Sequence, residues 1–219
     1  MNIKEYIETL PFKSVLPRAD GTYTVLPRIR HGWLDAERLA VIGGVVEEHG
    51  LKGVRISTGQ QLFIDGVPED RLKAVIDGLG EVGVAYRNKA QGCLGTDGCK
   101  LGQQDSRAAV VRLSEMLDTF VFPCKVKAGV SGCPMCCAET MVRDVGLFGR
   151  KHGWTVAFGG NAGQRPRQAD VLARDVSEDE AFDILGKALA FYAENGKKKE
   201  RTARFVERVG LDAVKAAIL

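Results

Sequence analysis

The sequence predicts an α+β fold in two parts: an N-terminal half with the element order β-α-β-β-α-β, followed by an α/β domain. Three observations predict it. Strand-like and helix-like segments alternate as far as residue 87, and caps or glycines stand at most of their ends. Two short glycine-flanked segments after residue 90 contain five of the six cysteines. Long amphipathic helices follow these segments. The expected divisions are an N-terminal segment at 1–20, a half-domain at 21–88 and a second domain at 89–219.

Composition and punctuation justify each element of the first half. Residues 1–20 form an amphipathic entry segment in which two prolines limit regular structure. Asp35 is the expected N-cap of the first helix, and Pro68 begins the second. The expected elements, in order, are a strand at 22–30, a helix at 35–50, β-prone runs at 53–57 and 61–66, a helix at 68–80 and a strand at 81–87. This order is the split βαβ, or ferredoxin-like, pattern.

The second half is expected to hold the cysteine segments between helices and strands. Ser177 and Glu180 form a capping-box signature at the start of a long helix. A hairpin is expected to turn near His152 and Gly153. The expected elements are a helix at 105–120, a strand at 124–130, a hairpin at 144–160, a loop at 159–168, a helix at 177–196 and a C-terminal helix.

Composition bounds the classes of function. The chain has 219 residues, of which 45% are hydrophobic and 27% charged, with a net charge of +3. This balance predicts a sizeable core and no globally basic surface for nucleic acid. No apolar run is long enough to span a bilayer, and residues 1–13 lack the apolar core of a secretory signal. A cytoplasmic location is expected, where clustered cysteines are metal ligands or catalysts rather than disulfides.

The spacing of the cysteines points to an inorganic centre. Cys93 and Cys99 are separated by five residues, and Cys133 and Cys137 by three. Cys136 gives a two-residue spacing from Cys133 that a structural zinc ion would accept, but the wider first pair suits a larger [4Fe–4S] cube. Zinc and buried structural thiols remain alternatives, as does a quartet that ends at Cys136.

The same cysteine pattern resembles the signature of the sirohaem-dependent nitrite and sulfite reductases. "PRIRHGW", "VRISTGQQLFIDG", "PCKVKAG" and "GGNAGQRP" are also similar to segments of that family, so the resemblance runs from about residue 20 to 200. It implies a [4Fe–4S] cluster held by Cys93, Cys99, Cys133 and Cys137. It also implies sirohaem, with Cys137 joining the cluster to the haem iron. The implied activity is six-electron reduction of sulfite to sulfide or of nitrite to ammonia.

The resemblance also implies roles for basic residues. Arg28 and Arg30 alternate along the first predicted strand, and Lys125 and Lys127 along a later one, so each pair is expected on one face. Arg30, Lys125 and Lys127 match the residues that bind the oxyanion and supply protons. The candidates for holding the sirohaem carboxylates are Arg28, Arg55, Thr58, Gln60, Asn161, Arg165 and Arg167. Gly59 departs from the family, in which an arginine often stands at this position.

Partners follow from the same comparison. A nucleotide-binding motif with a convincing context is lacking, so an external donor such as a ferredoxin or flavoprotein is expected to supply electrons. Larger family members contain both domain types twice, whereas this sequence has one copy, which predicts a homodimer or a compact monomer. Two rival functions are an iron–sulfur electron-transfer or redox-sensing protein without reductase activity, and a zinc-stabilised interaction domain.

Overall fold

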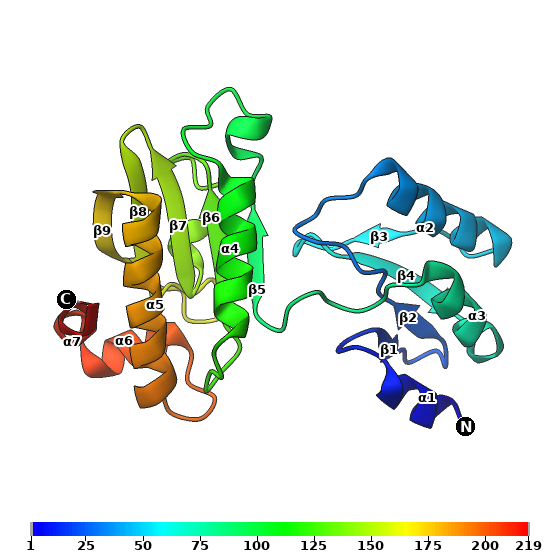
Figure 1. Ribbon diagram of the computed structural model, residues 1–219. Coiled ribbons are helices and arrows are strands. Elements are labelled where there is room, and N and C mark those ends of the chain that lie inside the picture. Colours follow the sequence, from blue (N-terminus) through cyan, green and yellow to red (C-terminus); the bar gives the residue numbers. More distant parts are fainter. Residues whose placement is uncertain (1, 219) are drawn as a thin grey trace. The chain divides into compact units, whose positions relative to one another are not determined.

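The computed structural model describes residues 2–218, and the chain divides into two compact units after Arg87. Each unit has its own sheet and its own apolar core (Figure 1). In residues 2–218, no helix is both long and apolar enough to cross a membrane.

The first unit is a four-stranded antiparallel sheet in the order β1-β2-β4-β3. Apolar side chains of its strands pack with those of α2 and α3, and Ile64, Val67, Leu72 and Val75 are fully buried. The elements are α1 (Ile3–Thr9), β1 (Val15–Pro17), β2 (Tyr23–Val25), α2 (Ala36–Glu48), β3 (Arg55–Ile56), β4 (Leu62–Val67) and α3 (Glu69–Leu79). The ferredoxin-like class is therefore confirmed.

Helices α2 and α3 begin at their predicted N-terminal residues. The Asp35 side chain accepts a hydrogen bond from the amide of Arg38 at the start of α2, and Pro68 is the N-cap of α3. The N-terminal segment is more regular than expected. An Asn2–Glu5 capping box begins α1, and β1 pairs with β2 at the edge of the sheet.

Two strand predictions in the first unit are wrong in extent. The strand expected at 22–30 ends at Val25, and the strand expected at 81–87 is a single bridge between Pro27 and Val82. Pro27 has no amide hydrogen to donate, and Gly83 adopts a φ of 86°. Because of both features, no ladder extends from this bridge. The geometric basis for placing Arg28 and Arg30 on one strand face is thereby removed.

The second unit is a five-stranded mixed sheet in the order β5-β6-β7-β8-β9. The pairs β5–β6 and β6–β7 are parallel, and the remaining two are antiparallel. Helices α4 and α5 lie across one face of this sheet (Figure 1). The elements are β5 (Lys89–Gly92), α4 (Ser106–Asp118), β6 (Lys127–Ser131), β7 (Val145–Arg150), β8 (Gly153–Phe158), β9 (Asp170–Val176), α5 (Glu178–Asn195), α6 (Thr202–Val209) and α7 (Leu211–Ile218), with short 3₁₀ turns η1 (Gly95–Asp97) and η2 (Thr140–Val142).

Alternation along the strands separates the two faces of this sheet. Val126, Ala128 and Val130 belong to the core under the helices, as do Trp154, Val156 and Phe158 of β8. The intervening residues face the other side. The predicted hairpin and the Ser177–Glu180 capping box are both confirmed. The strand expected at 124–130 begins later, at Lys127, and sequence reasoning missed β5 and β9.

The ion pair between Glu200 and Arg208 predicts acid sensitivity. Two 2.8 Å hydrogen bonds from Arg208 lower the pKa of Glu200 from 4.5 to about 2. A depressed folded-state pKa stabilises the protein above about pH 4.5, and this contribution is lost as the pH falls through about 2. We expect Glu200→Gln to have a lower free energy of unfolding than wild type at pH 6. The difference in free energy of unfolding between the two proteins should be smaller at about pH 2.5. Urea unfolding at both pH values measures it. Asp183→Asn, in an exposed pair with Lys187, is the control and should change little; an equal gap at both pH values would contradict the prediction.

Candidate functional site: two cysteine loops on one sheet face

The two cysteine loops begin at the carboxyl ends of neighbouring parallel strands. Cys93 directly follows β5, and Cys133 follows β6 after one glycine. The strands are in register, with Gly92 opposite Val130. Parallel strands end at the same edge of a sheet, so the register places the first cysteine of each loop at one edge.

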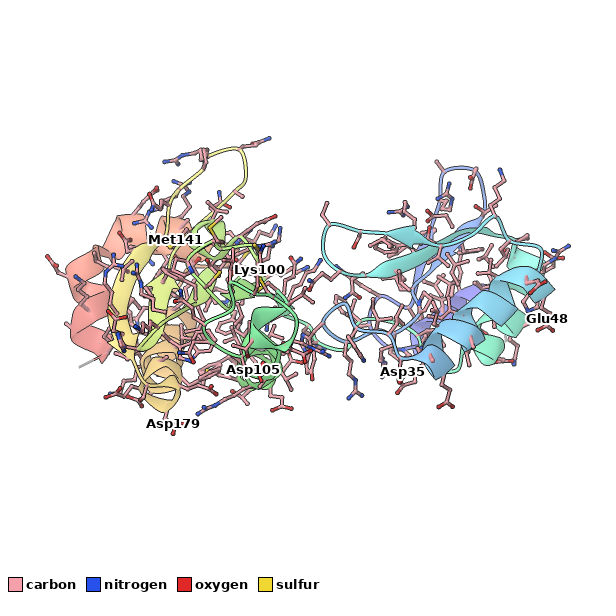
Figure 2. The ribbon with its side chains drawn as sticks, turned by 90° about the horizontal axis from the view of Figure 1, so that it is seen from above. Asp35, Glu48, Lys100, Asp105, Met141 and Asp179 are labelled. Carbon is pink, nitrogen blue, oxygen red and sulfur yellow. The ribbon has the colours of Figure 1, made fainter. Side chains whose placement is uncertain are left out.

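The loops are in direct backbone contact. The amides of Gln103 and Gln104 donate to the carbonyl of Gly132 at 2.8 and 3.0 Å. A Cβ atom on Gly132 would lie 2.5 Å from Cα of Gly95, so only glycine allows this approach. Figure 2 labels Lys100, which follows Cys99 in the first loop, and Met141, which follows the second loop.

The thiols are available as ligands. All six cysteines are free, with Cys133 buried, Cys137 exposed and the others half-buried. The sulfur of Cys93 accepts a hydrogen bond from the amide of Gly132 at 3.1 Å. Hydrogen bonds to cysteine sulfurs are one of the features that tune an iron–sulfur centre. Cys136 has a left-handed backbone with φ of 52°, which turns the loop between Cys133 and Cys137.

The cysteines supply the number of thiolates that a [4Fe–4S] cube requires. Within residues 2–218, no three His, Cys, Asp or Glu side chains converge closely enough to hold one metal ion. A [4Fe–4S] cube is larger and takes one thiolate at each iron, so its ligands stand further apart. Glycine-lined loops that meet at one sheet edge suit that size.

The second loop folds back across the sheet face opposite the helices. Cβ atoms on Gly129 and Gly146 would lie 2.3 Å from the carbonyl oxygen of Ala138 and 2.2 Å from that of Thr140. The amide of Ala138 also donates to the hydroxyl of Ser131 at 3.0 Å. Two glycines opposite one another on β6 and β7 therefore allow the loop backbone to rest on the sheet.

The predicted lysines approach this same face. Lys127 is two residues before Gly129, so alternation directs its side chain to the side that the loop covers. Val126 is fully buried, while Lys125 is exposed and Lys127 half-buried. Lys89 lies opposite Lys127 in the ladder and shares its face, and sequence reasoning missed it.

Four buried polar atoms of this unit lack a hydrogen-bond partner within residues 2–218. They are Oγ1 of Thr140, Nε of Arg143, Nε of Arg150 and Oγ1 of Thr155. Thr140 and Arg143 belong to the second loop and its end, and Arg150 and Thr155 project by alternation to the same sheet face. An unpaired buried polar atom costs about 1–3 kcal/mol. These atoms therefore fit a large, carboxylate-rich group bound on this face. Sequence reasoning missed all four, because only the pleat and the burial identify them.

In the first unit, two predicted cofactor ligands have protein partners. Arg28 donates to the carbonyl of Val82 at 3.0 Å and lies 3.8 Å from the Glu81 carboxylate. Arg55 contacts Asp65 at 2.6 Å, and this pair lowers the pKa of Asp65. Both arginines stabilise the half-domain locally.

The other first-unit candidates lie on two adjoining turns. Arg30 is exposed at the start of a tight turn closed by a 3.0 Å bond from the amide of Trp33 to its carbonyl. Gln60 packs against Gly32 of that turn, where a Cβ would be 3.0 Å from its own. Thr58 belongs to the same 57–61 turn as Gln60. Arg30, Thr58 and Gln60 are therefore on neighbouring segments.

The candidate ligands in the 159–168 loop differ in their protein contacts and in their exposure. Asn161 and Arg167 exchange backbone hydrogen bonds that close the loop. Arg167 also contacts Asp170 at 2.5 Å and is largely buried. The Arg165 side chain is 74% exposed at the tip, with a 3.5 Å contact to Glu207.

Comparisons with known proteins match both units of the chain. The ferredoxin-like half domain of nitrite and sulfite reductases matches residues 16–82, and the nitrite and sulphite reductase 4Fe-4S domain matches residues 83–219. An assimilatory-type sulfite reductase of Nitratidesulfovibrio vulgaris is 38% identical over 213 residues, which is 95% of this chain and 98% of that protein. The large subunit of the NADH nitrite reductase of Escherichia coli is 34% identical over 91% of this chain, which spans 25% of that subunit.

Solved structures show the same fold. The NirA protein of Mycobacterium tuberculosis superposes with a TM-score of 0.76 at 22% identity, covering 96% of this chain and 45% of NirA. Dissimilatory sulfite reductase I gives 0.73 at 15% identity, covering 90% of this chain and 68% of that one. With both domains matched in order over nearly the whole sequence, the chain belongs to the nitrite and sulphite reductase family.

Proposed function

We propose that this chain catalyses the six-electron reduction of sulfite to sulfide, or of nitrite to ammonia. The observation that carries the proposal is that two abutting cysteine loops meet at the carboxyl end of the sheet, and the second of them shares a sheet face with a pair of lysines and four unpartnered buried polar atoms. An electron carrier needs the thiols but has no use for an anion-binding group beside them.

The thiolates of Cys93, Cys99, Cys133 and Cys137 hold the [4Fe–4S] cluster in this proposal. Arg150, the exposed Arg165 and Arg143, whose Nη2 also contacts the Glu139 carboxylate at 2.7 Å, supply cations for the sirohaem carboxylates. When bound, the cluster would pass on electrons from an external donor, and sirohaem would supply an iron centre for the reduction. Arg167 and Asn161 fix the shape of the loop that carries Arg165.

Lys127 and Lys125 bind the anion and deliver protons. Reduction of sulfite to sulfide consumes protons as its oxygens leave as water, and an ammonium group can both attract the anion and donate to it. Arg30 adds a fixed planar charge. The backbone amide of Lys127 donates to the buried Asp144 carboxylate at 2.8 Å.

Replacing both lysines tests these roles. We expect Lys127→Ala to lower kcat/KM for sulfite by about 10–100-fold, because one anion contact and one proton donor are lost. Lys125→Ala should have a smaller effect, since that side chain is exposed. Lys151→Ala, on the β7–β8 turn, is the matched control. Steady-state kinetics with reduced viologen measures the change, and loss of sirohaem absorption instead of activity would contradict the assignment.

Sulfite is the preferred substrate in this proposal. The assimilatory-type sulfite reductase matches this chain from end to end, whereas the chain spans only a quarter of the E. coli nitrite reductase subunit. A comparison of kcat/KM for sulfite and nitrite tests this preference.

An optical spectrum of anaerobically purified protein tests the wider proposal, since sirohaem gives a Soret and a far-red band. A cluster without these bands would favour the electron-transfer alternative.

We also propose that two chains associate and that an external protein donates electrons. The chain spans about half of the NirA chain, so a pair of chains would supply what one larger chain contains. The thiols and lysines of one protomer would then serve the same centre as Arg30 of its partner. A holoprotein that is monomeric by size-exclusion chromatography and has full sirohaem occupancy would contradict this arrangement.

The location of the protein follows from its thiols. Six free thiols favour a reducing compartment such as the cytoplasm.

A further inference from the structure

Asp144 is a buried carboxylate whose two oxygens each accept two hydrogen bonds. Its side chain is 1% exposed and lies directly before β7. Oδ1 accepts from the hydroxyl of Thr202 at 2.6 Å and from Nε of Arg201 at 2.9 Å. Oδ2 accepts from Nη2 of Arg201 at 2.5 Å and from the amide of Lys127 at 2.8 Å. Asp144 and Thr202 are buried, whereas Lys127 and Arg201 are partly exposed.

The bond to Lys127 lies just beyond the regular ladder. Pairing between β6 and β7 begins at Ala128 and Val145, so the Asp144 carboxylate provides the acceptor for the next amide outward. The preceding amide, that of Val126, donates to the Asn88 side chain at 3.2 Å. Two side-chain acceptors therefore fix the backbone from which the Lys127 side chain leaves.

The backbone of Asp144 contacts a second part of the site. Its carbonyl accepts from the amide of Gly159 at 2.9 Å, at the start of the 159–168 loop. A Cβ on the next residue, Gly160, would lie 2.5 Å from the carbonyl oxygen of Arg143. The loop that carries Asn161 and Arg165 thus begins against the same short segment.

Arg201 offsets the cost of burying the charged Asp144 carboxylate. The fork of two bonds from Arg201 neutralises Asp144, and their mutual hydrogen bonding raises the pKa of Arg201. Removing one partner of a buried pair leaves an uncompensated charge.

We propose that Asp144, held by Arg201 and Thr202, is a positioning residue: it sets the direction of Lys127 toward the anion and the start of the cofactor loop. The inference depends on the proposed reductase function for its kinetic consequence. Its structural consequence, a protected amide at Lys127, is independent of that function.

The test uses mild changes around Asp144, so that folding is retained. Arg201→Lys keeps the charge but removes the fork, and Thr202→Val keeps the shape but removes a donor. Arg208→Lys is the matched control, since it makes the same change at the other end of α6, in the pair with Glu200. For each holoprotein, residue-resolved hydrogen exchange of the Lys127 amide, the optical spectrum, and kcat and KM for sulfite are measured.

We expect Arg201→Lys to speed exchange at Lys127 by about tenfold and to raise KM for sulfite by about tenfold, with the sirohaem spectrum unchanged. Thr202→Val should give smaller changes in the same direction, and Arg208→Lys neither. Unchanged exchange at Lys127 would overturn the inference, as would faster exchange with an unaltered KM. If wild-type protein with both cofactors reduces neither anion, the proposed function fails; faster exchange at Lys127 in Arg201→Lys would still support the positioning contact, and unchanged exchange would overturn it.

Discussion

Replacement of Cys137 by serine is expected to reduce sulfite turnover by more than about a hundredfold. Loss of a residue that hydrogen-bonds to a metal ligand typically lowers metal affinity or activity by about 10–100-fold. The loss should be larger for Cys137, because Cys137 is itself proposed as a ligand. A serine hydroxyl does not ionise at neutral pH as a thiol beside iron does, so it is a poor substitute. In the proposed site, Cys137 serves both the cluster and the haem iron. Its replacement should therefore lower iron content and alter the haem spectrum together.

The neighbouring cysteine provides a matched control for this experiment. Cys136→Ser makes the same chemical change one residue away, at a position with a left-handed backbone. We expect it to retain iron, spectrum and turnover. Iron analysis, optical spectroscopy and viologen-linked kinetics on both variants distinguish the two thiols. If Cys136→Ser loses the cluster and Cys137→Ser keeps it, the quartet ends at Cys136 and the assignment made here is wrong.

Local signals predicted much of the fold. Helix ends were predictable because caps act within one turn of the chain: Asp35 and Ser177 both accept the expected backbone hydrogen bonds. The cysteine loops were predictable because their spacing is local as well. The expected strand at 81–87 failed because pairing depends on a distant partner, and that partner is Pro27.

The site face could not be read from the sequence for a similar reason. Lys89 and Lys127 are neighbours only through the parallel register, which no short-range pattern encodes. Arg143 and Arg150 stand out only through burial without a partner for Nε. Conversely, Arg55 was an attractive candidate by residue type, but it pairs with Phe63 on the next strand, and Asp65, two residues further along that strand, contacts its side chain. Residue type identifies a candidate charge, while register decides whether that charge is available.

Gly146→Ala is expected to prevent cluster incorporation while leaving the helix-covered core intact. The added Cβ would lie 2.2 Å from the carbonyl oxygen of Thr140, and this neighbour is backbone that cannot rotate away. Overpacking of this kind costs about 1–3 kcal/mol, and the strain falls on the loop after Cys137. Gly186→Ala in α5 is the control: its Cβ would meet only Met116 Cε at 3.9 Å, so added helix propensity should stabilise by up to about 1 kcal/mol. Iron content, far-ultraviolet circular dichroism and thermal unfolding measure both variants. Full iron content and an unchanged Tm in Gly146→Ala would contradict this prediction. The second loop would then hold the cluster without its close backbone contact to β7.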